Sequence, residues 1–130
     1  MNIKLTKDER LRSKRIVERL FTTGKSVFIY PFKIFYFSEN ELSANQVQVL
    51  ITVSKRNFKK AVDRNRIKRL IREAYRKNKY GLCDQLKRHN KSMAIGLIYV
   101  GETILSYQEI ERKLILILQR LIEQDEEHIG

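Results

Sequence analysis

The sequence has 130 residues, of which 27 are Lys or Arg and 15 are Asp or Glu, so its formal net charge is +12. A chain of this length can bury one hydrophobic core but is too short for two ordinary domains, and its charge points to a polyanionic partner. The single cysteine, Cys83, excludes an internal disulfide, and neither a signal-peptide pattern nor a run of about 18 apolar residues is present. We expect one cytoplasmic domain over residues 1–130, with an ordered core over about residues 11–122 and an acidic C-terminal tail over residues 123–130.

The N-terminal part of the chain predicts one helix and two β segments. Ser13 is a suitable N-cap, apolar residues then recur at helical spacing, and Gly24 ends the helix. Residues 27–37 and 47–53 are rich in aromatic and β-branched residues, which predicts two strands that we interpret as an antiparallel hairpin. Pro31 can split the first of these strands into two pieces.

The middle of the chain predicts a second helix and a buried strand. The helix begins somewhere between Asn57 and Asp63 and runs to about Asn78, with Gly81 beyond its end in a polar connection. Residues 93–100 form a short apolar run, which favours a buried strand over a helix. This strand should join the sheet of the hairpin.

A final helix completes the predicted fold. Ser106 and Glu109 form an S-x-x-E capping box, and the apolar residues that follow it recur at helical spacing. The element order predicts an α+β fold, a two-layer sandwich in which helices cover a small, mostly antiparallel sheet.

The positive charge is concentrated in one part of the chain. Residues 51–90 contain 14 Lys or Arg and three acidic residues, whereas the remainder carries 13 Lys or Arg and 12 acidic residues. On the helix in this segment, one face collects basic and amide side chains: Asn65, Lys68, Arg69, Arg72 and Arg76. Like charges stacked on one stripe cost folding energy unless an external anion neutralises them. We therefore interpret the stripe as a binding face, not as an ordinary solvated surface.

The residue types of this face favour RNA over a membrane. Arginine offers a planar fork to phosphate oxygens, lysine a mobile charge, and asparagine both a donor and an acceptor. A membrane-bound helix would need its apolar side free for lipid, but here that side is needed to cover the sheet. We expect no membrane partner.

Residues 64–73 read RNRIKRLIRE and closely resemble the RNR signature of the bacterial ribonuclease P protein family. Three further segments have family-like spacing: Leu20-Phe21-x-x-Gly24-x-Ser26, Val53-Ser54-Lys55-Arg56 and Ala61-Val62. The resemblance covers about residues 11–122. It implies the order α-β-β-β-α-β-α with an unusual left-handed crossover.

The resemblance also implies a function. The chain would be the protein subunit of ribonuclease P, an endoribonuclease, and would bind both the catalytic ribonuclease P RNA and the 5′ leader of precursor tRNA. It would promote removal of the leader, while the RNA subunit performs the Mg²⁺-dependent cleavage. No cofactor bound tightly by the protein is implied, and we expect the chain to be monomeric before assembly.

The resemblance assigns these roles to particular residues. RNA contact falls to Lys55, Arg56, Lys60, Arg64, Asn65, Arg66, Lys68, Arg69, Arg72 and Arg76, and Asn65 would organise a bound metal ion. A cleft between the first helix and the sheet would hold the leader against Val17, Phe21 and Phe35. Exposed rings can stack on bases, although core packing explains each Phe equally well. The chain departs from the family pattern at two places. Val17 stands where the family often has a second aromatic residue, and the segment 57–60 is one residue longer than in the family and lacks its usual glycine.

No catalytic residue is predicted in this chain. Phosphodiester hydrolysis uses clustered carboxylates, paired histidines or metal-activated water, and the sequence shows no such cluster. We expect His89 and His128 to be solvent-exposed, and the terminal carboxylates Asp125, Glu126 and Glu127 to be mobile. Two alternatives stay open: a structural RNA-binding module of ribosomal or translation-factor type, and a protein nuclease with an unrecognised site.

Overall fold

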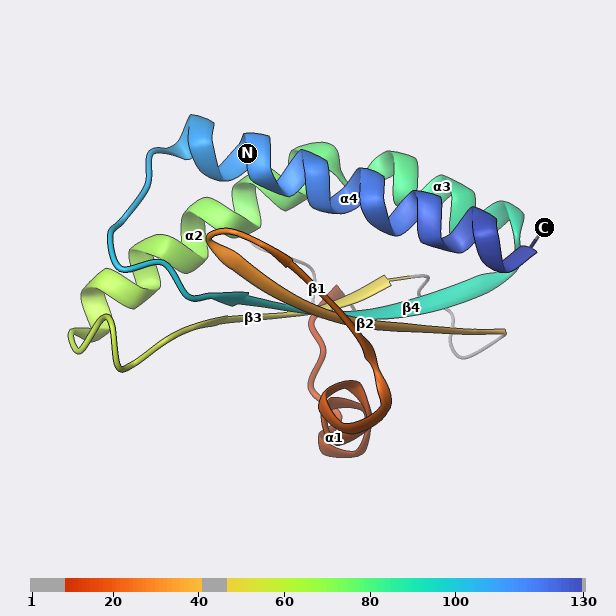
Figure 1. Ribbon diagram of the computed structural model, residues 1–130, viewed down its shortest axis with the longest axis horizontal. Coiled ribbons are helices and arrows are strands. Elements are labelled where there is room, and N and C mark those ends of the chain that lie inside the picture. The colour runs from red at the N-terminus through yellow and green to blue at the C-terminus, as the bar shows by residue number, and fades with distance from the viewer. Residues whose placement is uncertain (1–8, 41–46, 130) are drawn as a thin grey trace.

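The computed structural model describes residues 9–40 and 47–129, and its helices and strands alternate in one α+β unit (Figure 1). The elements are α1 (Lys14–Thr23), β1 (Lys25–Ile29), β2 (Phe32–Asn40), β3 (Val47–Val53), α2 (Ala61–Asn78), α3 (Tyr80–Arg88), β4 (Lys91–Tyr99) and α4 (Tyr107–Ile129). The four strands form one sheet in the spatial order β1-β2-β4-β3. Figure 1 shows α2, α3 and α4 on one side of this sheet and α1 on the other. The predicted fold class is confirmed.

The first predicted strand is divided at Pro31, as its sequence indicated. β1 and β2 pair antiparallel, with Val27 opposite Ile34 and Phe28 opposite Lys33. The turn between them contains a cis Tyr30–Pro31 peptide bond.

The predicted hairpin between residues 27–37 and 47–53 is wrong. β3 does not pair with β2 but lies at the edge of the sheet, parallel to β4, which pairs antiparallel with β2 on its other side. The physical reason is the burial of β4, because six successive residues, Ser92–Leu97, are buried and only a central strand is covered on both faces. The parallel pair requires a long connection, which α2 and α3 supply.

The polar connection predicted after Asn78 is also wrong, because residues 80–88 form α3. Gly81 lies inside this helix, and a Cβ there would meet only Ile122 Cδ1 at an ordinary 3.6 Å, so neither helix nor packing requires a glycine. Leu82 and Leu86, one turn apart, are completely covered by the core. This one-sided burial outweighs the helix-ending signal of the glycine.

Two hydrophobic clusters lie on opposite faces of the sheet. The larger one joins the sheet to α2, α3 and α4 and includes Phe32, Ile34, Ile71, Leu97, Tyr99 and Leu114. The smaller one lies under α1 and consists of Leu11, Leu20 and Ala94, with five partly buried neighbours. At Gly96 a Cβ would lie 3.0 Å from Leu20 Cδ2, so the missing side chain lets α1 approach β4 closely. α1 therefore covers only part of its face of the sheet.

The predicted helix ends are largely confirmed. Ser13 caps α1 by accepting a hydrogen bond from Ile16 N, and a Cβ at Gly24 would collide with the Leu20 carbonyl. The Oγ of Ser106 accepts a hydrogen bond from Glu109 N at 3.2 Å, as a capping box requires. α2 begins within the predicted window, but its N-cap, Lys60, makes no side-chain capping bond.

Candidate nucleic-acid interface

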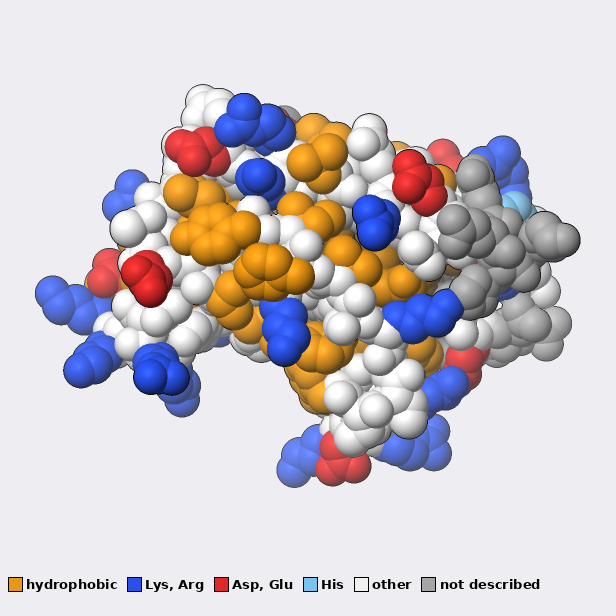
Figure 2. Space-filling model, in the orientation of Figure 1, with side chains coloured by type: hydrophobic (Ala, Val, Ile, Leu, Met, Phe, Trp, Pro, Cys, Tyr) orange, Lys and Arg blue, Asp and Glu red, His pale blue; other side chains and the backbone are white. Residues whose placement is uncertain are grey.

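α2 presents a row of cationic side chains away from the core. Its buried residues recur at helical spacing: Ile67, Ile71, Ala74 and Tyr75. The seven predicted RNA-binding residues of α2 are all exposed or partly exposed, from Arg64 to Arg76. We call five of them the α2 stripe: Asn65, Arg66, Lys68, Arg69 and Arg72. Across residues 9–40 and 47–125, no acidic side chain forms a salt bridge with any of them. Figure 2 shows Lys and Arg side chains gathered at the end of the molecule where β3 leads into α2.

The connection from β3 to α2 carries Lys55, Arg56 and Lys60, all of which are exposed. Asn57 holds it to the β4–α4 connection, because its Nδ2 donates to the carbonyls of residues 100 and 101 at 3.1 and 3.3 Å. The Nη1 of Arg64 donates to the carbonyls of residues 58 and 59 at 2.8 and 2.9 Å. The long turn without a glycine is therefore fixed by side chains, and Arg64 has a structural task besides any contact with RNA.

Arg10 and Arg12, which the sequence analysis missed, extend the positive surface around the β3 edge. Leu11 N donates to the Val49 carbonyl at 3.0 Å, which ties this segment to β3. A hollow of about 170 Å³ at the edge is lined by the segment, β3 and Arg72. Burial, and then the charges of Arg10 and Arg69, lower the pKa of Arg72. The sequence does contain a signal for this extension, because Arg10, Arg12, Lys14 and Arg15 form a local basic cluster. The cluster was overlooked because the total charge outside residues 51–90 is nearly balanced.

The three residues predicted for the leader cleft come together beside α1. The rings of Phe21 and Phe35 meet edge to face with centroids 4.9 Å apart, and Val17 packs into the same small cluster. Phe21 is 39% exposed, and Phe35 is partly buried. The Nζ of Lys33 lies 5.3 Å from the centroid of Phe35. The pair is therefore compatible with both core packing and base stacking. Phe35 packs against α1, while the ring of Phe21 stays partly open to solvent.

Phe37, another aromatic residue on this face, is covered by the side chain of Arg19. The guanidinium of Arg19 lies over the ring of Phe37, 4.3 Å from its centroid, and forms an ion pair with Glu39. This contact joins α1 to the far end of β2 and covers that end of the open face. The accessible part of the face therefore lies on the other side of Phe35.

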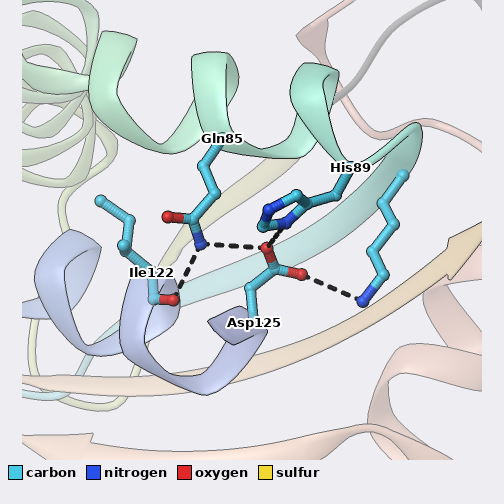
Figure 3. Close-up of polar contacts among 5 residues, drawn as sticks. Gln85, His89, Ile122 and Asp125 are labelled. Carbon is cyan, nitrogen blue, oxygen red and sulfur yellow. Dashed lines mark hydrogen bonds and ion pairs between the residues drawn. The ribbon is translucent and has the colours of Figure 1, made fainter. Parts of the chain in front are cut away.

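The C-terminal helix ends in a buried polar cluster that the sequence analysis did not anticipate (Figure 3). Gln85 Nε2 donates to Asp125 Oδ2 at 3.0 Å, His89 Nδ1 lies 2.8 Å from the same oxygen, and Lys91 Nζ donates to Oδ1 at 3.2 Å. Gln85 also donates to the Ile122 carbonyl at 2.9 Å. Burial by itself would raise the pKa of Asp125, but hydrogen bonds from His89, Gln85 and Lys91 outweigh it and lower that pKa.

The expectations of an exposed His89 and a mobile Asp125 are therefore wrong. His89 is partly buried, and Asp125 is only 3% exposed because α4 continues through residue 129 and returns to the α3–β4 corner. The side chains of Glu126, Glu127 and His128 lie outside the described residues. Both oxygens of the buried Asp125 carboxylate are occupied by partners, which is the arrangement of a structural clamp rather than of a general base.

Cys83 is partly buried, and its burial raises the pKa of its thiol. The thiol is therefore protonated near neutral pH, and Cys83 is a small packed side chain. Within the described ranges no three His, Cys, Asp or Glu side chains gather in a way that could hold a metal ion. In the same ranges, none of the helices is long and apolar enough to span a membrane.

Comparison with known proteins identifies the family. The sequence model of the family described as Ribonuclease P matches residues 5–122. The chain belongs to the ribonuclease P protein family. The ribonuclease P protein component of Porphyromonas gingivalis strain ATCC 33277 is 36% identical over 110 residues, covering 85% of this chain and 80% of that protein. That of Chlorobium phaeobacteroides is 40% identical over 105 residues, covering 75% and 72%.

Solved ribonuclease P proteins have the same fold. The protein from Thermotoga maritima matches with a TM-score of 0.66 and 26% identity, covering 86% of this chain and 96% of that one. The Staphylococcus aureus protein at 2.0 Å matches with a TM-score of 0.64 and 24% identity over 87% and 94% of the two chains, a likeness in fold alone. Membership of the ribonuclease P protein family does not favour the ribosomal or translation-factor alternative.

The ribonuclease P family implies a Mg²⁺-dependent reaction, but Asn65 by itself does not fit a protein-bound Mg²⁺. Its amide is exposed and neutral, and its chain neighbours Arg64 and Arg66 are cationic. Mg²⁺ prefers six oxygen ligands, with carboxylates or phosphates supplying the negative charge. The carboxylate nearest to Asn65 in the sequence is Asp63, two residues before it, and this side chain is partly buried. A metal ion near Asn65 would therefore have to be held mainly by the phosphates of a bound RNA.

Proposed function

We propose that this chain is the protein subunit of ribonuclease P, and that it binds the ribonuclease P RNA and the 5′ leader of precursor tRNA. The observation that carries the proposal is the α2 stripe, a cationic surface without acidic partners in the described structure, on a chain of this family. The chain contributes affinity and position, and the RNA subunit performs the endonucleolytic cleavage that removes the leader. Cytoplasmic location and a monomeric state before assembly remain predictions.

The α2 stripe and the β3–α2 connection are proposed to bind the ribonuclease P RNA. Arg66 and Arg69 are exposed and carry planar donor forks that match phosphate oxygens, and Arg10 extends the same surface toward α1. Phosphates would relieve the like-charge crowding around Arg72. Such contacts release counterions from the RNA, so binding should weaken steeply as salt concentration rises.

The open face beside α1 is proposed to hold the leader. Phe21 and Phe35 form a rigid aromatic pair there, and Lys33 beside Phe35 places a positive charge next to the ring. A single-stranded leader offers unpaired bases, which stack on aromatic rings with about 1–3 kcal/mol per base. Mature tRNA lacks the leader, so this surface would distinguish precursor from product.

The proposal assigns no chemical step to a residue of this chain. A Mg²⁺ ion held by the RNA would supply the chemistry, which is activation of water and stabilisation of the leaving oxygen. The residues of this chain position the two RNAs: the α2 stripe neutralises phosphates of the subunit RNA, and the aromatic pair orients the leader strand. Mg²⁺ is proposed to be held mainly by RNA, with Asn65 at most ordering its water shell.

Two sets of variants test this division of labour. Arg69→Ala should weaken assembly with a bacterial ribonuclease P RNA by roughly 1–3 kcal/mol, because a charge-assisted phosphate contact is lost. Phe35→Ala should leave assembly nearly unchanged and reduce the preference of the assembled enzyme for precursor over mature tRNA. Arg112→Ala is the matched control, since Arg112 is exposed and lies on α4, which contributes no residue to either surface. Affinities are measured by filter binding at fixed salt.

The outcomes separate the two surfaces. Protein stability must be measured in parallel, because truncating a buried Phe costs about 3–5 kcal/mol and could imitate a loss of binding. Phe21→Ala provides a second variant with less risk, since its ring is already 39% exposed. If folded variants of both kinds weaken assembly equally and leave the preference for precursor unchanged, the two-surface proposal is wrong.

A further inference from the structure

The face of the sheet beside α1 includes two rows of side chains that cross all four strands. The pairing register defines the first row as Phe28, Lys33, Ile98 and Thr52, and the second row as Ser26, Phe35, Gly96 and Leu50. α1 packs on the second row, because Leu20 and Phe21 contact Gly96 and the cluster under α1 contains Phe35 and Leu50. No residue of the first row belongs to either hydrophobic cluster. The first row is therefore left open beside the covered one.

Phe28 is the most exposed ring of this face. It is 62% exposed, although β1 directs its neighbours Val27 and Ile29 into the main core on the other face. Its ring contacts that of Tyr30, with centroids 6.5 Å apart, but Tyr30 is itself 54% exposed, so this contact does not bury Phe28 in the core. Phe28 stands opposite Lys33 on β2, and Phe35 lies two residues farther along β2 on the same face. Such diagonal neighbours have Cα atoms about 7–8 Å apart, within reach of one continuous strand of stacked bases.

The charge and the aromatic rings of this face fit a polyanion that also carries flat, apolar groups. Neither row contains an acidic residue, and Lys33, which stands opposite Phe28, has its Nζ 5.3 Å from the centroid of Phe35. Figure 2 shows hydrophobic side chains running from the α4 layer across β1 and β2 toward α1, with Lys or Arg side chains among them. Four-stranded sheets with aromatic residues on an open face stack two or three bases of single-stranded RNA.

We propose that Phe28, with Lys33 beside it, forms an additional nucleotide-binding position that continues the Phe21–Phe35 platform along the single-stranded leader. The inference rests on the proposed function and adds to it a specific subsite. One base stacks on Phe28, the phosphate next to it pairs with Lys33, and the neighbouring base stacks on the Phe21–Phe35 pair. The β1–β2 hairpin thereby lengthens the leader contact beyond the cleft under α1.

An abasic scan of the leader tests this subsite in the assembled enzyme. Precursor tRNAs with one abasic nucleotide at successive leader positions are bound to ribonuclease P reconstituted with wild-type protein, Phe28→Ala or Phe35→Ala. We expect Phe28→Ala to weaken binding of the intact precursor by about five-fold or more, the lower end of one base–aromatic stack. Each variant should also become insensitive to the abasic nucleotide at one leader position, and the two positions should differ.

Matched variants separate stacking from general apolar contact. Phe28→Tyr keeps an aromatic ring and should bind as wild type, whereas Phe28→Leu should bind as weakly as Phe28→Ala. Lys33→Gln should lower the slope of log affinity against log salt by about 0.7, the value for one phosphate of a single strand. Tyr80→Ala is the control, because Tyr80 is 60% exposed beside a lysine but lies on α3. It should change nothing.

The results distinguish failure of the subsite from failure of the proposed function. If Phe35→Ala loses leader discrimination while Phe28→Ala binds as wild type, the Phe28 subsite does not exist and the leader cleft stands. Equal binding by Phe28→Leu and wild type would also overturn the subsite, since it would show an apolar contact without stacking. If neither ring variant changes leader binding, the proposed leader function fails together with the subsite.

Discussion

Asp125→Asn removes a buried carboxylate that joins α4 to the α3–β4 corner. The side chain receives hydrogen bonds from Gln85, His89 and Lys91, and an asparagine offers only one accepting oxygen in place of two. Lys91 then loses its anion while its side chain is only 15% exposed. Breaking a fully buried pair costs about 3–5 kcal/mol, and the remaining solvent contact of Lys91 and His89 reduces this. We expect a loss of about 2–3 kcal/mol in the free energy of unfolding near pH 7.

The stability difference between wild type and Asp125→Asn should depend on pH. The pKa of Asp125 is lowered in the folded protein from its ordinary value of 3.8, so its charge stabilises the fold above that value. This contribution is lost as pH falls through the folded pKa, whereas asparagine does not titrate. The gap between wild type and Asp125→Asn should therefore narrow as pH falls below about 4.

Urea denaturation at a series of pH values measures the gap directly. Asp84→Asn is the control, because Asp84 is an exposed carboxylate on α3, and it should change stability by less than about 0.5 kcal/mol. A gap below that size for Asp125→Asn near neutral pH would refute the clamp. A gap that does not narrow in acid would show that the charge of Asp125 is not what stabilises the corner.

Three further outcomes are expected. Arg69→Ala should lower the slope of log RNA affinity against log salt by about 1, and an unchanged slope in a salt titration would place Arg69 outside the interface. Arg64→Ala should cost about 1–2 kcal/mol of stability in denaturation, because two loop carbonyls lose their donor, whereas the exposed Arg66→Ala should cost little. Gly96→Ala should push the side chain of Leu20 by a few tenths of an ångström, since the new Cβ would lie 3.0 Å from Leu20 Cδ2. This change under α1 should weaken leader discrimination more than RNA assembly, and the reverse order of effects would contradict the placement of the cleft.

Local signals in the sequence predicted the elements whose causes are local. Ser13, the Ser106–Glu109 capping box and the apolar periodicity of α2 each act within one or two helical turns, and each is where the sequence placed it. The same periodicity predicted the side of α2 on which Asn65, Lys68, Arg69 and Arg72 lie. Pro31 divided the first strand because a proline cannot donate a ladder hydrogen bond.

Contacts between distant segments could not be predicted in this way. Nothing in the composition of β3 tells whether its neighbour is β2 or β4, since that depends on which strand is buried on both faces. The His89–Asp125 contact joins residues 36 apart in the sequence, and both residues look like exposed polar groups when read locally. Arg10 meets Arg72 only because the segment before α1 runs along the β3 edge. Family resemblance supplied the leader cleft, which no periodicity indicates.

The most direct test of the account is cleavage of precursor tRNA by a bacterial ribonuclease P RNA at near-physiological salt, with and without this protein. We expect the protein to increase the cleavage rate at subsaturating precursor, and Arg69→Ala to require more protein for the same increase. Purified protein without the RNA should produce no site-specific cleavage, even with Mg²⁺. An absence of stimulation by correctly folded protein, or specific cleavage that survives removal of all RNA, would contradict the assignment of this chain as the RNA-binding subunit of ribonuclease P.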